Sequence, residues 1–462
     1  MYSTTVTRAA TALLLTANTM VSALDLDITS VESIKNTAAT IAYDMMLEYK
    51  GNVSGGYIGV LPGPPPNPPT GYYWWESGAM WGSLIDYWHY TNDTSYNDVT
   101  SAGIQAQVGE DIDMMPSNWS QSMGNDDQAF WGMTAMLAAE YNFPAPADPK
   151  APSWLSLAQA VFNTQAVRPD KECGGGLRWQ VFPYLTGYDY KNSIANGCFF
   201  NIGARLARYT NNDTYAQHAE TTWNWITNVG LMDAEYNVYD GAHIGHNCTD
   251  INKVQFSYNS AVWLLGAANM YNYTNGSAIW EERTNRLLNR TLQVFFPEPQ
   301  RVAYEVACES TLKCTTDMFS FKSYLTRWLA STIKMAPYTH DTIMSYLKPS
   351  AVAAAQQCIG GANGRTCGLS WNSGKWDGTF GVGQQMAAMS SVFVTLADLV
   401  PVAAPFTNAT GGTSQGNPNA GSGSHHDTSL IKPATGSDRA GAGVVTALIL
   451  IGATGMFGWM SI

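Results

Sequence analysis

Two adjacent carboxylates, Asp126 and Asp127, are the strongest chemical feature of the sequence. They stand in the stretch GNDDQAFWGMTAMLAAE, at the start of an otherwise apolar segment with helical spacing. Cleavage of a glycosidic bond needs one carboxyl group that protonates the leaving oxygen and a second that attacks the anomeric carbon or activates water. Two carboxylates held close together have pKa values that move apart, so one can be ionised while the other keeps a proton. The pair therefore indicates glycoside chemistry, and neighbouring residues can hold their carboxyl groups about 5–5.5 Å apart, as in retaining enzymes.

The pair also has a purely structural interpretation. One aspartate can cap the helix, and the other can lie in the first turn, where the helix dipole favours negative charge. We favour catalysis because an unpaired charge at the start of a buried helix would be costly. Other chemistries have weaker support. His243 and His246 near Cys248 lack a third metal ligand, and the sequence has no nucleophile elbow, P-loop or strand-linked GxGxxG motif. We therefore expect neither a metal nor a cofactor.

Segments rich in alanine, glycine and serine recur along the chain and must position this pair. They begin near residues 76, 126, 192, 258, 321 and 381, and their small residues let a helix pack closely on several sides. More polar amphipathic segments alternate with them, at residues 29–49, 96–112, 152–163, 214–229, 277–295 and 340–357. Six inner and six outer helices in alternation predict an all-α (α/α)6 barrel. Short β-ribbons are expected near residues 174–181 and 302–308.

The inner helices of such a barrel run in one direction, so their N-terminal ends gather at one end of the molecule. Aromatic rings at these ends suit the C–H faces of sugars, and amides and charged groups suit hydroxyls. The candidate substrate-binding residues are Trp75, Glu76, Asn125, Trp131, Lys191, Asn192, Tyr258, Asn259, Lys322, Trp376 and Asp377. Glu76, Lys191 and Lys322 have an alternative role as partners in ion pairs.

Both ends of the chain carry targeting features. Residues 1–23 contain Arg8, a short apolar run and small residues at positions 21 and 23, which predict a cleaved signal peptide. Residues 24–405 would form one catalytic domain. Residues 406–436 have the composition of a flexible linker, and residues 437–462 end in an apolar tail. This order predicts a GPI-attachment signal that is removed, and a C-terminal transmembrane anchor is the alternative.

The composition fits a secreted protein that binds a neutral ligand. The net charge of −12 disfavours nucleic acid as a partner, because phosphate binding needs a basic face. Nine Asn-x-Ser/Thr sequons favour secretion through the ER, at Asn52, Asn92, Asn118, Asn212, Asn247, Asn272, Asn275, Asn289 and Asn408. We expect a monomer held by a GPI anchor at the outer face of the plasma membrane or in a cell wall.

The seven cysteines are then expected to be partly oxidised. Cys308 with Cys314, and Cys358 with Cys367, are close enough in sequence to bridge short loops. Cys173, Cys198 and Cys248 leave one further disulfide and one free thiol, in an arrangement that the spacing leaves open.

The stretch around the aspartates resembles the signature of glycoside hydrolase family 76, the endo-α-1,6-mannanases. The stretches YYWWESGAMWGSLIDYW, KNSIANGCFFNIGARLAR, FSYNSAVWLLGAANMY and FGVGQQMAAM resemble its fungal, GPI-anchored cell-wall branch, so the resemblance spans about residues 24–401. It implies an (α/α)6 barrel and retaining cleavage of α-1,6-mannose linkages, with Asp126 as nucleophile and Asp127 as general acid/base. It also implies that the mannose core of a GPI glycan is cut and the linked protein transferred to wall β-glucan.

Two further questions stay open at this level. A covalent glycosyl-enzyme can be captured by water or by a sugar hydroxyl, so no motif separates hydrolysis from transfer. A mannan- or GPI-glycan-binding wall protein without catalysis is the alternative hypothesis. Such a protein would keep the aromatic cleft and could lose the acids, whereas both acids are present.

Overall fold

The computed structural model describes residues 24–65, 71–120, 122–423 and 436–460, and within them inner and outer helices alternate along the chain. The inner helices are α2 (Trp74–Thr91), α5 (Asn125–Glu140), α7 (Ser193–Thr210), α9 (Ser257–Tyr273), α11 (Phe321–Met335) and α13 (Val382–Phe393). The outer helices are α1 (Val31–Met46), α3 (Asn97–Gln105), α6 (Trp154–Ala166), α8 (Asp213–Val229), α10 (Ala278–Phe295) and α12 (His340–Gln356). A short helix, α4 (Ser117–Ser120), precedes α5.

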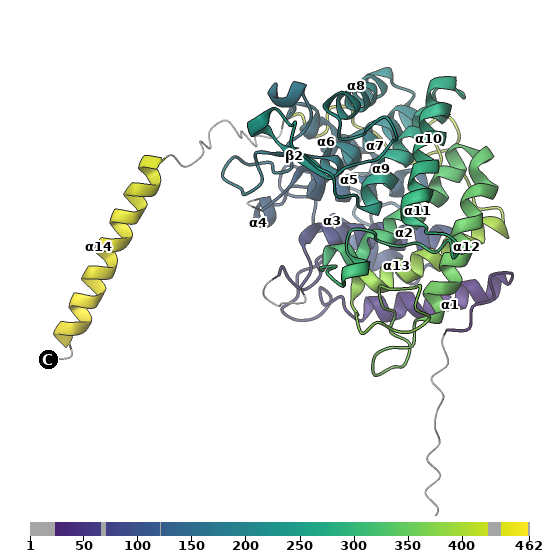
Figure 1. Ribbon diagram of the computed structural model, residues 1–462, viewed down its shortest axis with the longest axis horizontal. Helices are drawn as coiled ribbons and strands as arrows, with labels where there is room; N and C mark the ends of the chain where they lie inside the picture. Colours follow the sequence, from purple (N-terminus) through teal and green to yellow (C-terminus); the bar gives the residue numbers. More distant parts are fainter. Residues whose placement is uncertain (1–23, 66–70, 121, 424–435, 461–462) are drawn as a thin grey trace, which may run out of the picture.

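The inner helices form a closed ring. Each contacts the next inner helix along the chain, and α13 returns to contact α2. Figure 1 shows α8 and α10 outside α7 and α9, with α12 and α1 outside α11 and α13. The predicted all-α (α/α)6 barrel is therefore confirmed for the described residues.

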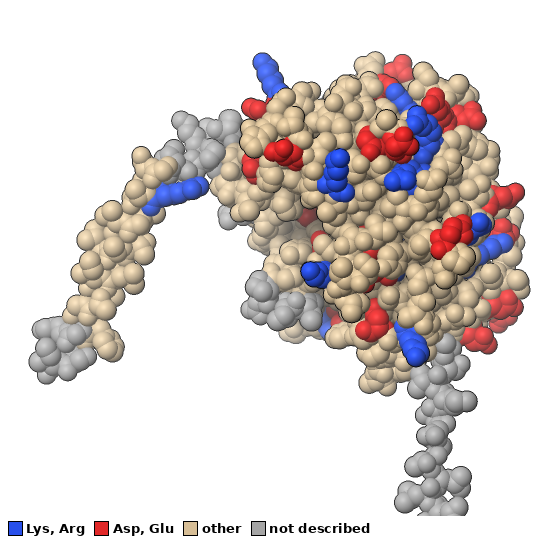
Figure 2. Space-filling view, viewed as in Figure 1, with Lys and Arg blue, Asp and Glu red and all other residues tan. Residues whose placement is uncertain are grey.

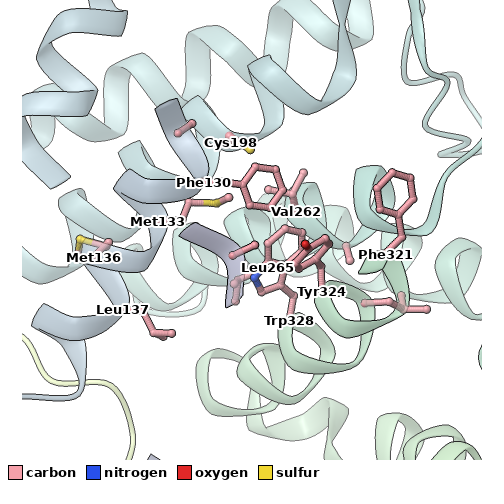
Figure 3. Packing of buried hydrophobic residues seen from close by; sticks show 14 of the residues in the cluster. Phe130, Met133, Met136, Leu137, Cys198, Val262, Leu265, Phe321, Tyr324 and Trp328 are labelled. Atoms are coloured by element: carbon pink, nitrogen blue, oxygen red, sulfur yellow. The ribbon is translucent and has the colours of Figure 1, made fainter. Parts of the chain in front are cut away.

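Glycines on the inner helices allow this close packing. A Cβ at Gly78 of α2 would lie 2.7 Å from the Trp131 ring of α5, and one at Gly266 of α9 would lie 2.4 Å from the Phe200 ring of α7. The outer helices are amphipathic instead: α10 buries one face, which includes Leu287, Leu288 and Leu292. The barrel interior is filled by side chains from several inner helices, among them Phe130, Leu265, Tyr324 and Trp328 (Figure 3).

The β-structure differs from the prediction. Three short strands, β1 (Tyr190–Asn192), β2 (Gly241–His243) and β3 (Ile251–Asn252), form an antiparallel sheet in the order β1-β2-β3. The expected ribbons at 174–181 and 302–308 are wrong, apart from an isolated bridge between Gly124 and Gln180. Three successive glycines with positive φ, residues 174–176, turn the chain where the first ribbon was expected.

Disulfides cross-link the segments that connect an outer helix to the next inner helix. The structure confirms the bridges Cys308–Cys314 and Cys358–Cys367. It pairs Cys173 with Cys248 and leaves Cys198 as a buried free thiol. The long-range bridge joins the loop before β1 to the segment between β2 and β3, so it braces the sheet that precedes α7 and α9.

The predicted linker starts later than its composition indicates. Residues 406–423, which we call the C-terminal segment, lie against the barrel: the Phe406 N–H donates to the Glu140 carbonyl (2.7 Å), and Asn163 donates to the carbonyls of Pro418 and Ala420 (2.8 Å each). Helix α14 (Gly436–Met460) follows further on and stands apart from the barrel in Figure 1. Its residues Gly436–Phe457 are long and apolar enough to cross a membrane, and none of that hydrophobic stretch is buried. The predicted signal peptide, residues 1–23, lies outside the described residues.

Candidate active site

A cleft of about 650 Å³ opens where the N-terminal ends of the inner helices meet. Its walls come from the starts of α2, α5, α9 and α11 and from the loops that precede them. The side chains that line it are mainly aromatic and acidic: Tyr73, Trp74, Trp75, Trp119, Asp126, Asp127, Phe130, Trp179, Tyr190, Asn192, Asp240, Phe256, Tyr258, Asp317 and Phe321.

Asp126 and Asp127 lie in the first turn of α5 and keep partial exposure to this cleft. Gly124, in extended conformation, is the last residue before the helix, and its N–H donates to Oδ2 of Asp127. The Asp127 N–H donates to Oδ1 of Asp126 at 3.1 Å. The free N–H groups of the helix start therefore orient both carboxylates, as expected at a helix N-terminus.

Asn125 positions this turn rather than lining the cleft. Its backbone N–H donates to the Trp179 carbonyl (2.8 Å), and its side-chain amide donates to the Arg178 carbonyl (2.9 Å). Arg168 in turn donates to Oδ1 of Asn125 at 2.6 Å. These bonds clamp the 178–179 loop onto the start of α5, which places the Trp179 side chain so that it hydrogen-bonds Asp126.

The surroundings of the two carboxyl groups make them unequal acids that hold protons near neutral pH. Burial raises the pKa of Asp127 to about 7; the bond from Gly124 opposes this rise, and the charge of Asp317 adds to it. Burial, and then the charge of Asp127, raise the pKa of Asp126 well above its usual value. One carboxyl can thus donate a proton while the other is ionised, which is the condition for acid-assisted cleavage.

Two further acidic residues of the cleft, Asp240 and Asp317, were not predicted from the sequence. Asp240 precedes β2 and accepts a hydrogen bond from the Tyr190 hydroxyl at 2.7 Å. Asp317 begins a short 3-10 turn (Asp317–Ser320) that leads into α11, and its carboxylate accepts the Met318 N–H at 3.0 Å. Burial raises the pKa of both groups. Both lie in loops without a recognisable motif, and only the position of Asp317, four residues before an inner helix, could have indicated it.

Three of the predicted binding residues line the cleft with the aspartates. Trp75 packs against Phe130, with ring centroids 4.5 Å apart. Tyr258 stacks on Phe321 at 3.9 Å and an interplanar angle of 7°, which fixes an aromatic wall. Asn192 caps α7 by accepting the Ala195 N–H at 3.2 Å.

The two predicted lysines instead bind protein groups. Lys191 is fully buried and donates to Asp170 (2.7 Å) and to the carbonyls of the 172–176 turn. Lys322 is also fully buried, pairs with Glu309 at 2.9 Å and lies over the Trp371 ring at 4.0 Å. The interpretation of these lysines as ion-pair partners therefore fits the structure, because a buried ammonium needs such partners. No Lys or Arg lines the described part of the cleft.

Three more candidates lie behind the cleft wall. Glu76 is 2% exposed, and its carboxylate accepts the Tyr73 N–H at 2.8 Å, which closes the start of α2. Trp131 is fully buried and stacks on Trp74 at 5.1 Å. Asn259 is also fully buried on α9.

Trp376 and Asp377 lie outside the cleft, because the loop before α13 folds on itself. The Asp377 carboxylate accepts the N–H groups of Ser370 (2.8 Å) and Thr379 (2.9 Å). Trp376 lines a separate hollow beside α1 and α13. The expectation that the start of every inner helix contributes side chains to the cleft is therefore wrong for this loop.

The comparisons with known proteins agree with this geometry. Residues 33–409 match the family model described as glycosyl hydrolase family 76. The chain belongs to that family. Family 76 membership makes this chain a glycoside hydrolase.

Relatives of this family 76 chain cover nearly its full length. It is 44% identical over 447 residues, 96% of each chain, to the mannan endo-1,6-alpha-mannosidase DCW1 of Saccharomyces cerevisiae. It is 43% identical to DFG5 of the same yeast, over 95% of this chain and 94% of that one. The crystal structure of Dfg5 from Chaetomium thermophilum, in complex with glucosamine, has a TM-score of 0.84 and 50% identity, covering 87% of this chain and 99% of that one.

The barrel is shared with more distant proteins. An α-1,6-mannanase GH76A of Salegentibacter sp. HEL1_6 has a TM-score of 0.63 at 17% identity, covering 79% of this chain and 100% of that one. This likeness concerns the fold alone. Among the described residues, no group of three or more His, Cys, Asp or Glu side chains is arranged to hold a metal ion.

Proposed function

We propose that this family 76 enzyme is a retaining, endo-acting glycosidase and transglycosidase on α-1,6-linked mannose. Its donor would be α-1,6-mannan or the mannose core of a GPI glycan, and its acceptor would be a sugar hydroxyl of wall β-glucan. The observation that carries the proposal is the pair of unequal carboxyl groups, Asp126 and Asp127, partly exposed in an aromatic cleft.

The chemistry divides between the two carboxyl groups. Asp126 attacks the anomeric carbon and forms a glycosyl ester, while Asp127 donates its proton to the departing oxygen. In the second step Asp127 takes the proton of a water or sugar hydroxyl, whose oxygen attacks the anomeric carbon and releases Asp126. A pKa of about 7 suits Asp127 for both directions of proton transfer.

The bound donor favours ionisation of one carboxyl of this coupled pair. Positive charge develops on the sugar ring as its bond to the leaving oxygen breaks, and it stabilises the ionised form of the nearest carboxylate. With Asp126 as that carboxylate, the proton of the pair rests on Asp127. The Trp179 hydrogen bond to Asp126 favours the same charged form.

The walls of the cleft support cleavage at an internal bond of a mannan chain. Trp74 and Trp75 come from α2, on one side of α5, and Trp179 and Tyr190 come from the segment before α7, on the other side. Sugar units on both sides of the cleaved bond can therefore contact aromatic faces. The names of the yeast relatives, mannan endo-1,6-α-mannosidases, and the glucosamine complex of the Chaetomium protein support a mannose donor linked to an amino sugar.

The two ends of the chain support a place outside the cell. The apolar, unburied helix α14 fits a GPI-attachment signal that is removed, and the sequons fit passage through the ER. We infer attachment at the outer face of the plasma membrane or in the cell wall, as a monomer. Such a location brings the enzyme to GPI-linked glycans and to wall glucan.

Single substitutions test the assignment. Asp126→Asn and Asp127→Asn should each abolish turnover of a defined mannosyl-glucosaminyl donor while circular dichroism and Tm stay close to those of the parent protein. Full activity in either variant would overturn the proposal. Product analysis with and without a β-glucan oligosaccharide separates transfer from hydrolysis.

The two roles are separated by an activated donor. An aryl mannoside with an acidic phenol needs no proton donor for its departure. Asp127→Ala should therefore still release about one equivalent of phenol per enzyme in a burst, followed by slow turnover, and Asp126→Ala should release none. The reverse result would exchange the roles. Tight glycan binding by the parent protein with neither product would favour the non-catalytic wall protein instead.

A further inference from the structure

A second hollow, of about 280 Å³, lies beside the C-terminal end of α1 and the start of α13. Its walls include Glu48, Asn363, Thr366, Trp376, Phe380 and Gln385. None of these residues lines the catalytic cleft, so the hollow is a separate site on the barrel.

The aromatic part of this hollow is fixed before any ligand binds. The indole Nε1 of Trp376 donates to the Thr379 carbonyl at 2.7 Å. Its ring packs on Gly360, where an added Cβ would lie 2.2 Å from the ring. Phe380, four residues further on, is 62% exposed although it is a large apolar side chain. An ordered indole beside an exposed phenyl ring is a surface on which a sugar ring can stack.

One polar side chain of the hollow, that of Gln385, has an atom without a hydrogen-bond partner. Gln385 is 4% exposed, and its Oε1 atom is buried without a partner among the described residues. A buried amide oxygen in this state costs free energy until a donor reaches it. The neighbouring Asp44 is already occupied by Arg365, at 2.7 and 2.9 Å, and Glu48 is the other carboxylate in the wall, where it can accept a hydroxyl. A neutral molecule with hydroxyl groups fits this chemistry.

The hollow shares a wall with the catalytic cleft. The Val382 N–H donates to the Tyr72 hydroxyl at 3.0 Å, and Gly381, which lines the hollow, lies against the same hydroxyl. The next residue, Tyr73, lines the cleft. The two sites therefore lie at the same end of the barrel, separated by residues 72–73.

We propose that this hollow is a second sugar-binding site, which holds one neutral pyranose unit of the wall glucan strand that serves as acceptor. The identity of the strand rests on the proposed function. The sugar stacks on Trp376 and Phe380, and one of its hydroxyls hydrogen-bonds the side-chain amide of Gln385. A glucan held there lies beside the cleft in which the glycosyl-enzyme forms.

Binding to inactive protein tests this site without turnover. In the Asp127→Asn protein, β-1,3-gluco-oligosaccharide and α-1,6-manno-oligosaccharide are titrated separately, and binding is followed by calorimetry. Adding Phe380→Ala, or Gln385→Leu, should weaken glucan binding about fivefold, since one aromatic contact or one buried hydrogen bond is worth about 1 kcal/mol. Tyr338→Ala, an exposed aromatic residue on another face, is the matched control and should leave binding unchanged.

The outcomes separate this site from the catalytic assignment. With Asp126 and Asp127 intact, Phe380→Ala should leave hydrolysis of a short mannan oligosaccharide unchanged and reduce transfer to glucan. Equal glucan affinity in the parent, Phe380→Ala and Gln385→Leu proteins would overturn the site. Loss of manno-oligosaccharide binding alone would overturn the glucan assignment. If the proposed function is wrong, the Asp126 and Asp127 variants will keep their activity, whatever the Phe380 and Gln385 variants do to glucan binding.

Discussion

Asp317 acts on Asp127, the carboxyl group that we propose as the acid/base. Its negative charge raises the pKa of Asp127, so removing the charge should lower that pKa below about 7. The value of kcat/KM falls as pH rises through the pKa of the required acid. Asp317→Asn should therefore move the alkaline limb of the kcat/KM profile to lower pH. Asp240→Asn is the control, because Asp240 lies in the same cleft without acting on Asp127, and an unmoved limb in Asp317→Asn would contradict the prediction.

Gly124 leaves room for both catalytic carboxylates. An added Cβ would lie 2.2 Å from Oδ1 of Asp126 and 3.0 Å from Oδ2 of Asp127. Its backbone φ of −82° suits alanine, so the substitution acts through this crowding and not through backbone strain.

Gly124→Ala should therefore lower kcat by about 100-fold, the usual cost of moving a catalytic group by about 1 Å. The Tm should change little. Steady-state kinetics and thermal unfolding measure both effects. Gly245→Ala, where a Cβ meets no atom within 4 Å, is the matched control. A Gly124→Ala enzyme with parental kcat would show that the carboxylates can move freely.

At the scale of elements, the helices were predictable and the loops were not. Small residues at helical spacing identify the inner helices, because burial on every side demands them. The start of α5 and its aspartates followed from the same pattern. Loop residues did not follow this pattern. Lys191 and Trp376 both stand near the start of an inner helix in the sequence, but Lys191 binds the 170–176 turn and Trp376 lines the second hollow. Such choices depend on contacts between distant segments, which periodicity does not encode.

Glu305, which is hydrogen-bonded to the start of α9, makes the free energy of unfolding depend on pH. Its carboxylate accepts hydrogen bonds from the N–H and hydroxyl of Ser257, the first residue of α9. Burial raises the pKa of Glu305 from its usual value to about 8. The folded state then holds a proton that the unfolded state releases, so stability is greatest below the unfolded pKa and is lost as pH rises to about 8.

Glu305→Gln should remove this dependence, since the amide carries no titrating proton. Between pH 5 and 8 the parent protein should lose up to about 1.4 kcal/mol per pH unit from this group. The free energy of unfolding of the variant should fall less steeply over that range. Urea unfolding of both proteins at several pH values measures the difference. Parallel curves would contradict the raised pKa of Glu305.

At the scale of the whole molecule, composition misjudged the C-terminal segment. Glycine, serine and asparagine are typical of flexible linkers, yet residues 406–423 are held by the ends of α5, α6 and α7. Short polar residues here supply hydrogen bonds to the barrel rather than freedom. Acidic and basic side chains are scattered among other residues over the face shown in Figure 2.

The C-terminal segment covers buried charges at the end of the barrel opposite the cleft. Glu140, at the end of α5, pairs with Arg205 (2.7 Å) and Arg208 (3.1 Å), all nearly buried. Arg208 also donates to the carbonyls of Pro405 and Phe406. Removing the segment would expose this network and leave Arg208 without one of its acceptors, which weakens the buried pair.

A chain that ends at Pro405 should therefore have a Tm several degrees below that of a chain that ends at Gly423, with equal kcat on a short oligosaccharide. The activity should persist because the cleft lies at the other end of the inner helices. Asn163→Ala in the longer chain, which removes only the bonds to Pro418 and Ala420, should give an intermediate Tm. Scanning calorimetry and steady-state kinetics distinguish the cases. Equal Tm values for the two chains would show that the segment adds no stability, and composition would then have described it correctly.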